Sequence, residues 1–153
     1  MASDQAILTG RCACGQLRFR MRGPPIVVHA CHCRDCQRET GSAFAVNVMV
    51  ESDRLTLEGA GAAQPLSSDG VRRCEACGTR FWGHVPALGK GLAFVKAGVF
   101  DDPAGLTPHV HCYTRSKHPW VALPAGAPAF EADYDGAAVL SAAAMARIAA
   151  ARS

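Results

Sequence analysis

Residues 12–15 are Cys12-Ala13-Cys14-Gly15, and residues 74–78 are Cys74-Glu75-Ala76-Cys77-Gly78. Two cysteine pairs, each followed by glycine, are typical of a zinc site, because glycine accepts the left-handed backbone that turns amides toward the sulfurs. Four thiolates complete the tetrahedral shell of zinc and leave no position for a substrate. We therefore predict a structural zinc held by Cys12, Cys14, Cys74 and Cys77. The alternative is two pairs of buried free cysteines.

A third cluster, Cys31-His32-Cys33-Arg34-Asp35-Cys36, places three cysteines close together. Three sulfurs can surround one ion and leave a position for water or substrate, as in a catalytic zinc site. Zinc keeps a bound thiol ionised and can polarise a neighbouring carbonyl group. The spacing thus predicts a catalytic zinc on Cys31, Cys33 and Cys36, and chemistry between a thiol and a carbonyl compound. Completion of the shell by Cys112 or by a histidine such as His32 would instead make the site structural.

The composition is that of one globular domain, with 153 residues, 49% hydrophobic and 19% charged. Its apolar stretches are too interrupted to span a membrane, and residues 1–10 do not resemble a signal peptide. We therefore expect a cytoplasmic location, where reduced cysteines bind metal rather than each other. The net charge of +3 is scattered along the chain, which argues against a nucleic-acid partner. The oligomeric state stays open.

Hydrophobic patterning predicts a mainly β domain. The expected strands are residues 17–21, 26–30, 44–50, 55–57, 79–85, 92–100 and 109–113. Residues 59–70 are small and polar and predict a surface loop. The Ala-rich residues 137–151 predict a marginal helix that is loosely docked or forms a tail. We divide the chain into a zinc domain over residues 6–130 and a C-terminal extension over residues 131–153.

Together, the motifs resemble those of one known family. They comprise Gly10-x-Cys12-x-Cys14-Gly15, Cys31-His32-Cys33-x₂-Cys36-Gln37-Arg38-x₂-Gly41-Ser42-Ala43-Phe44, Cys74-x₂-Cys77-Gly78-Thr79, Lys96-Ala97-Gly98 and Arg115-Ser116-Lys117-x-Pro119-Trp120. This series is similar to the glutathione-dependent formaldehyde-activating enzymes. The resemblance implies a zinc-centred β-tent with two zinc ions per chain. It also implies that glutathione adds to formaldehyde to give S-hydroxymethylglutathione, a carbon–sulfur lyase reaction run in reverse.

Glutathione carries two carboxylates, so its site requires a cation. Arg38, and after it Arg34, are the predicted substrate-binding residues because they are closest in sequence to the three-cysteine cluster. Two other functions remain open. One is a zinc-stabilised thiol redox enzyme with Cys112 as nucleophile, which would leave the three-cysteine cluster unused. The other is a non-enzymatic zinc binding module.

Overall fold

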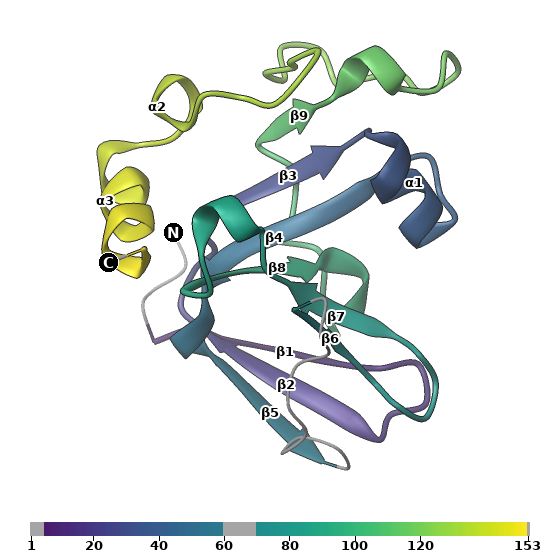
Figure 1. Ribbon diagram of the computed structural model, residues 1–153, viewed down its shortest axis with the longest axis vertical. Coiled ribbons are helices and arrows are strands. Elements are labelled where there is room, and N and C mark those ends of the chain that lie inside the picture. Colours follow the sequence, from purple (N-terminus) through teal and green to yellow (C-terminus); the bar gives the residue numbers. More distant parts are fainter. Residues whose placement is uncertain (1–4, 60–69, 153) are drawn as a thin grey trace.

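The computed structural model describes residues 5–59 and 70–152 (Figure 1). Its strands form two sheets, which confirms the mainly β prediction. The three-stranded sheet has the order β1-β2-β5 and the larger sheet the order β6-β7-β8-β4-β3-β9. The strands are β1 (Ile7–Arg11), β2 (Leu17–Arg22), β3 (Val27–Cys31), β4 (Ala45–Glu51), β5 (Leu55–Gly59), β6 (Val71–Arg73), β7 (Arg80–Gly83), β8 (Leu92–Lys96) and β9 (Val110–Cys112).

The main core lies between the two sheets. Leu17, Phe19 and Met21 alternate with arginines along β2, so one face of that strand is buried and the other exposed. The Phe19 ring packs edge-on against Phe81, with centroids 5.7 Å apart, and against Phe100, at 5.0 Å. The central strand β4 is an almost continuous apolar run because both of its faces are covered.

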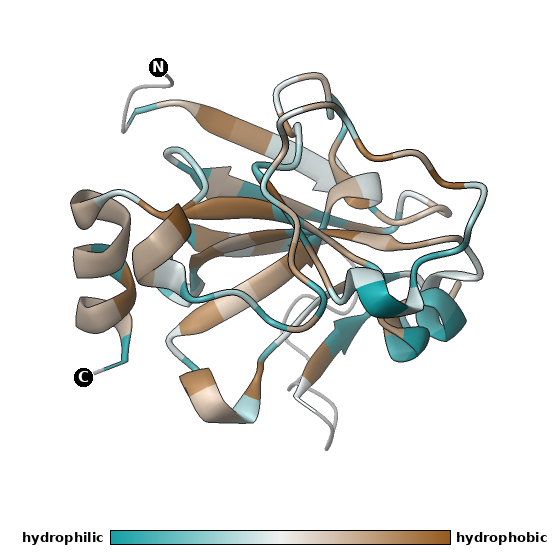
Figure 2. Cartoon of the chain, turned by 90° about the horizontal axis from the view of Figure 1, so that it is seen from above, coloured by the Kyte–Doolittle hydropathy of each residue, from teal (hydrophilic) through white to brown (hydrophobic). Residues whose placement is uncertain are grey.

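The opposite face of the larger sheet is covered by the C-terminal segment, shown in yellow in Figure 1. This segment contains α2 (Gly136–Val139) and α3 (Ala142–Ala151). Residues from it pack on Met49 and Leu92 of the sheet, and Figure 2 shows α3 composed mainly of apolar residues. The single helix predicted for residues 137–151 is therefore interrupted. Leu140 is extended, and the Ser141 hydroxyl accepts from the Ala144 amide at 3.2 Å to begin α3.

The structure adds a helix that the sequence patterning missed. Helix α1 (Arg34–Thr40) begins at the Cys33 cap and ends at Gly41, whose φ of 60° is left-handed. The predicted strand over residues 92–100 ends at Lys96 and continues as a single 3₁₀ turn, η3 (Ala97–Val99). The other 3₁₀ turns are η1 (Ser52–Arg54), η2 (Pro86–Leu88) and η4 (Thr114–Ser116).

The predicted loop over residues 59–70 lies outside the described residues apart from its two end glycines. Within the described ranges, no helix combines the length and apolar character that crossing a bilayer requires.

Candidate metal centre and cavity

The four cysteines of the two pairs that precede Gly15 and Gly78 come together as predicted. The ligand sulfurs of Cys12, Cys14, Cys74 and Cys77 all lie within 4.8 Å of one another, although the two pairs are far apart in sequence. Each pair closes a tight turn. The Gly15 amide donates to the Cys12 carbonyl at 3.0 Å, and the Gly78 amide donates to the Cys74 carbonyl at 2.8 Å. Both glycines have positive φ, near 75°, which explains their place after the cysteines.

This four-sulfur group has the chemistry of a closed metal site. Hydrogen bonds from the Thr79 side chain and backbone lower the pKa of Cys77 to about 5. For Cys14, a backbone hydrogen bond at Gln16 favours the thiolate, but the neighbouring sulfurs outweigh it and raise the pKa to about 12. The sulfurs therefore oppose one another's ionisation, and a bound dication would remove that conflict. The donor set fits zinc, with all four positions filled by protein.

The three remaining clustered cysteines form a second group at the start of α1. The sulfurs of Cys31, Cys33 and Cys36 lie within 4.8 Å of one another. Among the described residues, no histidine nitrogen, carboxylate oxygen or further sulfur lies that close to all three. The group thus offers three donors, which is the number predicted for a catalytic metal site.

Local hydrogen bonds hold the three sulfurs in place. Cys33 is the N-cap of α1, and its sulfur accepts from the Cys36 amide at 3.3 Å. The buried Gln37 amide donates to the carbonyls of His32, at 2.8 Å, and Ser116, at 2.9 Å. The Ser116 hydroxyl also donates to the His32 carbonyl, at 2.9 Å. The loop that carries the cysteines is therefore attached to the turn after β9.

A cavity of about 460 Å³ opens beside the three-sulfur group. Cys31 and Cys36 line it, together with Cys112, which pairs with Cys31 across the parallel strands β9 and β3. The polar lining includes His29, Glu39, Asn47, Arg80, Lys96, Asp133 and Tyr134, and the apolar lining Met49, Val85, Leu88, Phe94, Leu140, Met145 and Ile148. The cavity therefore connects reactive sulfurs to both polar and apolar surface.

Lys96 supplies positive charge beside the sulfurs. Its ammonium donates to the Asn47 side-chain oxygen at 2.9 Å and pairs with Glu39 at 2.6 Å. Glu39 is also paired with Arg80. Burial lowers the pKa of Lys96, whereas the charge of Cys36 opposes that shift. Lys96 is not among the site residues predicted from the sequence, although Lys96-Ala97-Gly98 is one of the family-like motifs.

The two predicted substrate-binding arginines lie outside the cavity lining. Arg38 is exposed and pairs with Asp35 at 3.1 Å within α1. Arg34 donates to the Gln37 side chain. Both remain on the helix that carries Cys36, and their role stays a prediction.

His32 is fully buried and turned toward another histidine. Its Nε2 lies 3.1 Å from His111 Nδ1, and it is not part of the three-sulfur group. Cys112 is buried and likewise outside that group. Neither residue lies within 4.8 Å of all three sulfurs, although a hydrogen bond between the Cys31 and Cys112 side chains raises the pKa of Cys31.

The comparison with known families agrees with this geometry. Residues 7–116 match the profile of the family described as "Glutathione-dependent formaldehyde-activating enzyme". The chain belongs to this family. A relative from Halomonas elongata, named "Putative glutathione-dependent formaldehyde-activating enzyme", is 27% identical over 127 residues, covering 76% of this chain and 81% of the relative.

A crystal structure of a Rhodobacter sphaeroides protein is also similar, with a TM-score of 0.44 and 14% identity. It covers 80% of this chain and 98% of that protein. At this level of similarity the match adds nothing to the family assignment.

Proposed function

We propose that the protein is a zinc-dependent enzyme that adds a thiol, glutathione or a relative, to formaldehyde or another small aldehyde. The class is carbon–sulfur lyase, and the product with formaldehyde is S-hydroxymethylglutathione. One observation supports it above the others. The sulfurs of Cys31, Cys33 and Cys36 lie together, Cys31 and Cys36 line a cavity, and no other donor among the described residues lies within 4.8 Å of all three sulfurs. Family membership supports the same chemistry. A cytoplasmic location, where thiols stay reduced, is part of this proposal.

In this proposal Cys12, Cys14, Cys74 and Cys77 hold a structural zinc, and Cys31, Cys33 and Cys36 a catalytic zinc, giving two ions per chain. Zinc at the three-sulfur group would supply a Lewis acid that favours the thiolate form of the incoming thiol. The thiol loses its proton, a carbon–sulfur bond forms, and a proton ends on the former carbonyl oxygen. The Lys96 ammonium, which lines the same cavity, stabilises the negative charge on that oxygen.

Arg38 and Arg34 are the proposed partners of the glutathione carboxylates. They lie on α1 with Cys36, so they suit the part of glutathione that remains outside the cavity. Of the cations that line the cavity, Lys96 and Arg80 are already paired with Glu39, and Arg152 donates to the Ala87 carbonyl at 3.3 Å.

The test is the rate of exchange between glutathione, formaldehyde and their adduct, measured by NMR against the spontaneous reaction. The zinc-loaded protein is expected to accelerate the exchange, and Cys33→Ser to remove the acceleration while leaving the fold intact. An exchange rate equal to the spontaneous one, with both metals bound, would contradict the proposal.

A redox function has one supporting observation, because Cys112 lies in the same cavity as Cys31 and pairs with it across two strands. That function requires Cys112 as nucleophile. The exchange rate of the Cys112→Ser variant separates the redox function from the addition reaction. The addition reaction needs only Cys31, Cys33 and Cys36, so this variant is expected to retain it. Loss of a dithiol-dependent reductase activity in this variant, with no aldehyde exchange in the wild type, would favour the redox function.

A further inference from the structure

The cavity continues beyond the sulfurs along the strands of the larger sheet. Side chains two residues apart on a strand share a face, so the lining forms successive rows. Cys31 stands in the first row. His29, Asn47 and Lys96 are register partners in the second, and Met49 and Phe94 in the third. The third row lies four residues along β4 from Ala45, the register partner of Cys31, about 13 Å away.

The second row is polar and its members bond to one another. Lys96 donates to Asn47, the Asn47 side-chain nitrogen lies 3.2 Å from His29 Nε2, and His29 Nδ1 lies 3.0 Å from the Tyr134 hydroxyl. These groups can orient a polar head group near the sulfurs. Because these groups already have hydrogen-bond partners, the apolar part of a ligand can lie beside them without leaving a buried polar group unpaired.

The third row is apolar and is covered by the C-terminal segment. Met49 and Phe94 form the floor. The C-terminal segment also lines the cavity, with one cation, Arg152, and with the apolar side chains of Leu140, Met145 and Ile148. These last three residues follow the part of the chain that matches the family profile, residues 7–116. This apolar wall is therefore contributed by sequence outside the family match.

The apolar side chains at this end of the cavity complement neither formaldehyde nor glutathione. A water-sized molecule occupies about 30 Å³ in the liquid, so the cavity is far larger than formaldehyde requires. The carboxylates and ammonium of glutathione would lose their hydration against Met49, Phe94 and Ile148 at a large cost. A cavity of this size with mixed lining is typical of a site for an amphipathic small molecule.

We propose that the aldehyde substrate carries an apolar group, an unbranched alkyl or arylalkyl chain, which lies between the third row and the C-terminal segment while its carbonyl carbon reaches the sulfurs. The inference rests on the proposed function for the reaction at the sulfurs. The apolar contacts of the ligand are inferred from the residues that line the cavity and do not depend on the proposed reaction.

The first experiment measures binding without reaction. Butan-1-ol and octan-1-ol, unreactive analogues of the aldehydes, are titrated into the zinc-loaded protein by calorimetry. Each buried methylene strengthens binding up to about fourfold, so octanol is expected to bind at least roughly tenfold more tightly than butanol. Ile148→Asp is expected to remove this difference, whereas Ala146→Asp, on the exposed side of α3, keeps it. If Ile148→Asp does not fold, Met145→Trp fills the cavity instead and is expected to weaken octanol selectively.

Equal affinity for the two alcohols, or an undiminished difference in Ile148→Asp and Met145→Trp, would overturn the inference. The second experiment compares the exchange of glutathione with formaldehyde and with octanal. The protein is expected to accelerate the exchange with octanal. Acceleration of formaldehyde alone would also overturn the inference but leave the proposed function in place. A third outcome is that alcohol affinity rises with chain length but glutathione exchange is accelerated with neither aldehyde. This outcome would overturn the proposed function and also the inference that the ligand is an aldehyde.

Discussion

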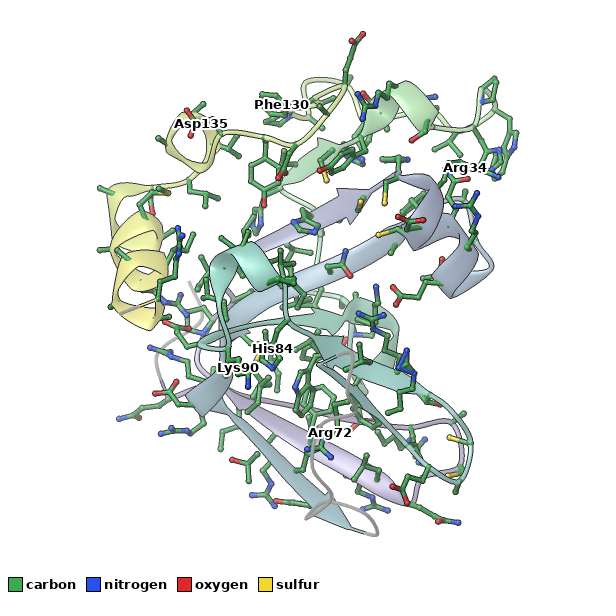
Figure 3. The ribbon with its side chains drawn as sticks, viewed as in Figure 1. Arg34, Arg72, His84, Lys90, Phe130 and Asp135 are labelled. Carbon is green, nitrogen blue, oxygen red and sulfur yellow. The ribbon has the colours of Figure 1, made fainter. Side chains whose placement is uncertain are left out.

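Arg147 on α3 and Glu51 at the end of β4 form a two-point ion pair, with Nε–Oε1 at 2.7 Å and Nη2–Oε2 at 2.6 Å. Both side chains are largely buried, and Arg147 also donates to the Pro24 carbonyl at 3.0 Å. Parallel hydrogen bonds between arginine and a carboxylate fix geometry as well as adding energy. This pair therefore attaches the C-terminal helix to the sheet. The segment that carries this helix can be found in Figure 3 from Asp135, which is labelled and is the N-cap of α2.

Arg147→Met is expected to lower the free energy of unfolding by roughly 2 kcal/mol, the scale of charge-assisted hydrogen bonds. Chemical denaturation measures the change. Arg20→Met is the matched control, since the Arg20–Glu58 pair, at 2.8 Å, is half exposed and is expected to contribute less than about 1 kcal/mol. Similar decreases in the free energy of unfolding in the two variants would argue against the Arg147–Glu51 pair as the attachment of the C-terminal helix.

Acid is expected to destabilise the protein in two ranges. Burial lowers the pKa of His29 to about 4 from its ordinary 6.5, so the unfolded chain takes up this proton first and stability falls as pH drops from 6.5 toward 4. For Glu51, burial raises the pKa, but the Arg147 hydrogen bond outweighs it and the net shift is downward. That contribution is present above pH 4.5 and is lost as pH falls below it.

His29→Gln tests the upper range. Melting temperature is measured from pH 8 to pH 4 for this variant and the wild type. The variant is expected to show a flatter decline between pH 6.5 and pH 5, because its side chain does not titrate. Parallel curves for the variant and the wild type would contradict the assignment.

The two sulfur groups are expected to respond differently to loss of a ligand. Cys33→Ser should lose the metal that a mild chelator removes first and retain its fold, because the open group closes no long loop of the chain. Cys77→Ser should impair folding, since its group joins distant segments and metal binding contributes to folding free energy. Metal analysis and circular dichroism measure both effects. A stable, soluble Cys77→Ser protein would be inconsistent with the structural role.

Lys96→Met is expected to slow glutathione exchange about a hundredfold, the lower end of what one charge-stabilising donor contributes. Lys90→Met, an exposed lysine outside the cavity lining, should leave the rate unchanged. Metal content of both variants is measured first, so that a lower rate is attributed to the ammonium rather than to lost zinc. An unchanged rate in Lys96→Met would remove this residue from the proposed reaction.

The sulfur groups were predictable because ligand type and short spacing carry the signal directly. Glycine after each pair also showed where the backbone turns. Helix α1 was not predictable by periodicity, because residues 34–40 have no apolar stripe and the helix depends on the Cys33 cap and on buried Gln37. The break at Leu140 was hidden by uniformly high helix propensity.

The cavity could not be predicted, because it depends on sheet register. Lys96 reaches the sulfurs only because β8 pairs with β4 and β4 with β3. Arg38 and Arg34 were chosen by closeness in sequence, which does not measure closeness in space.

The account depends on an open position at the three-sulfur group. Diffraction from crystals of the zinc-loaded protein, with anomalous differences at the zinc edge, tests this directly. We expect two ions, one bound by four cysteine sulfurs and one by Cys31, Cys33 and Cys36 with water or an added thiol as its fourth ligand. A second ion closed by Cys112 or by any other side chain of the protein would contradict the account.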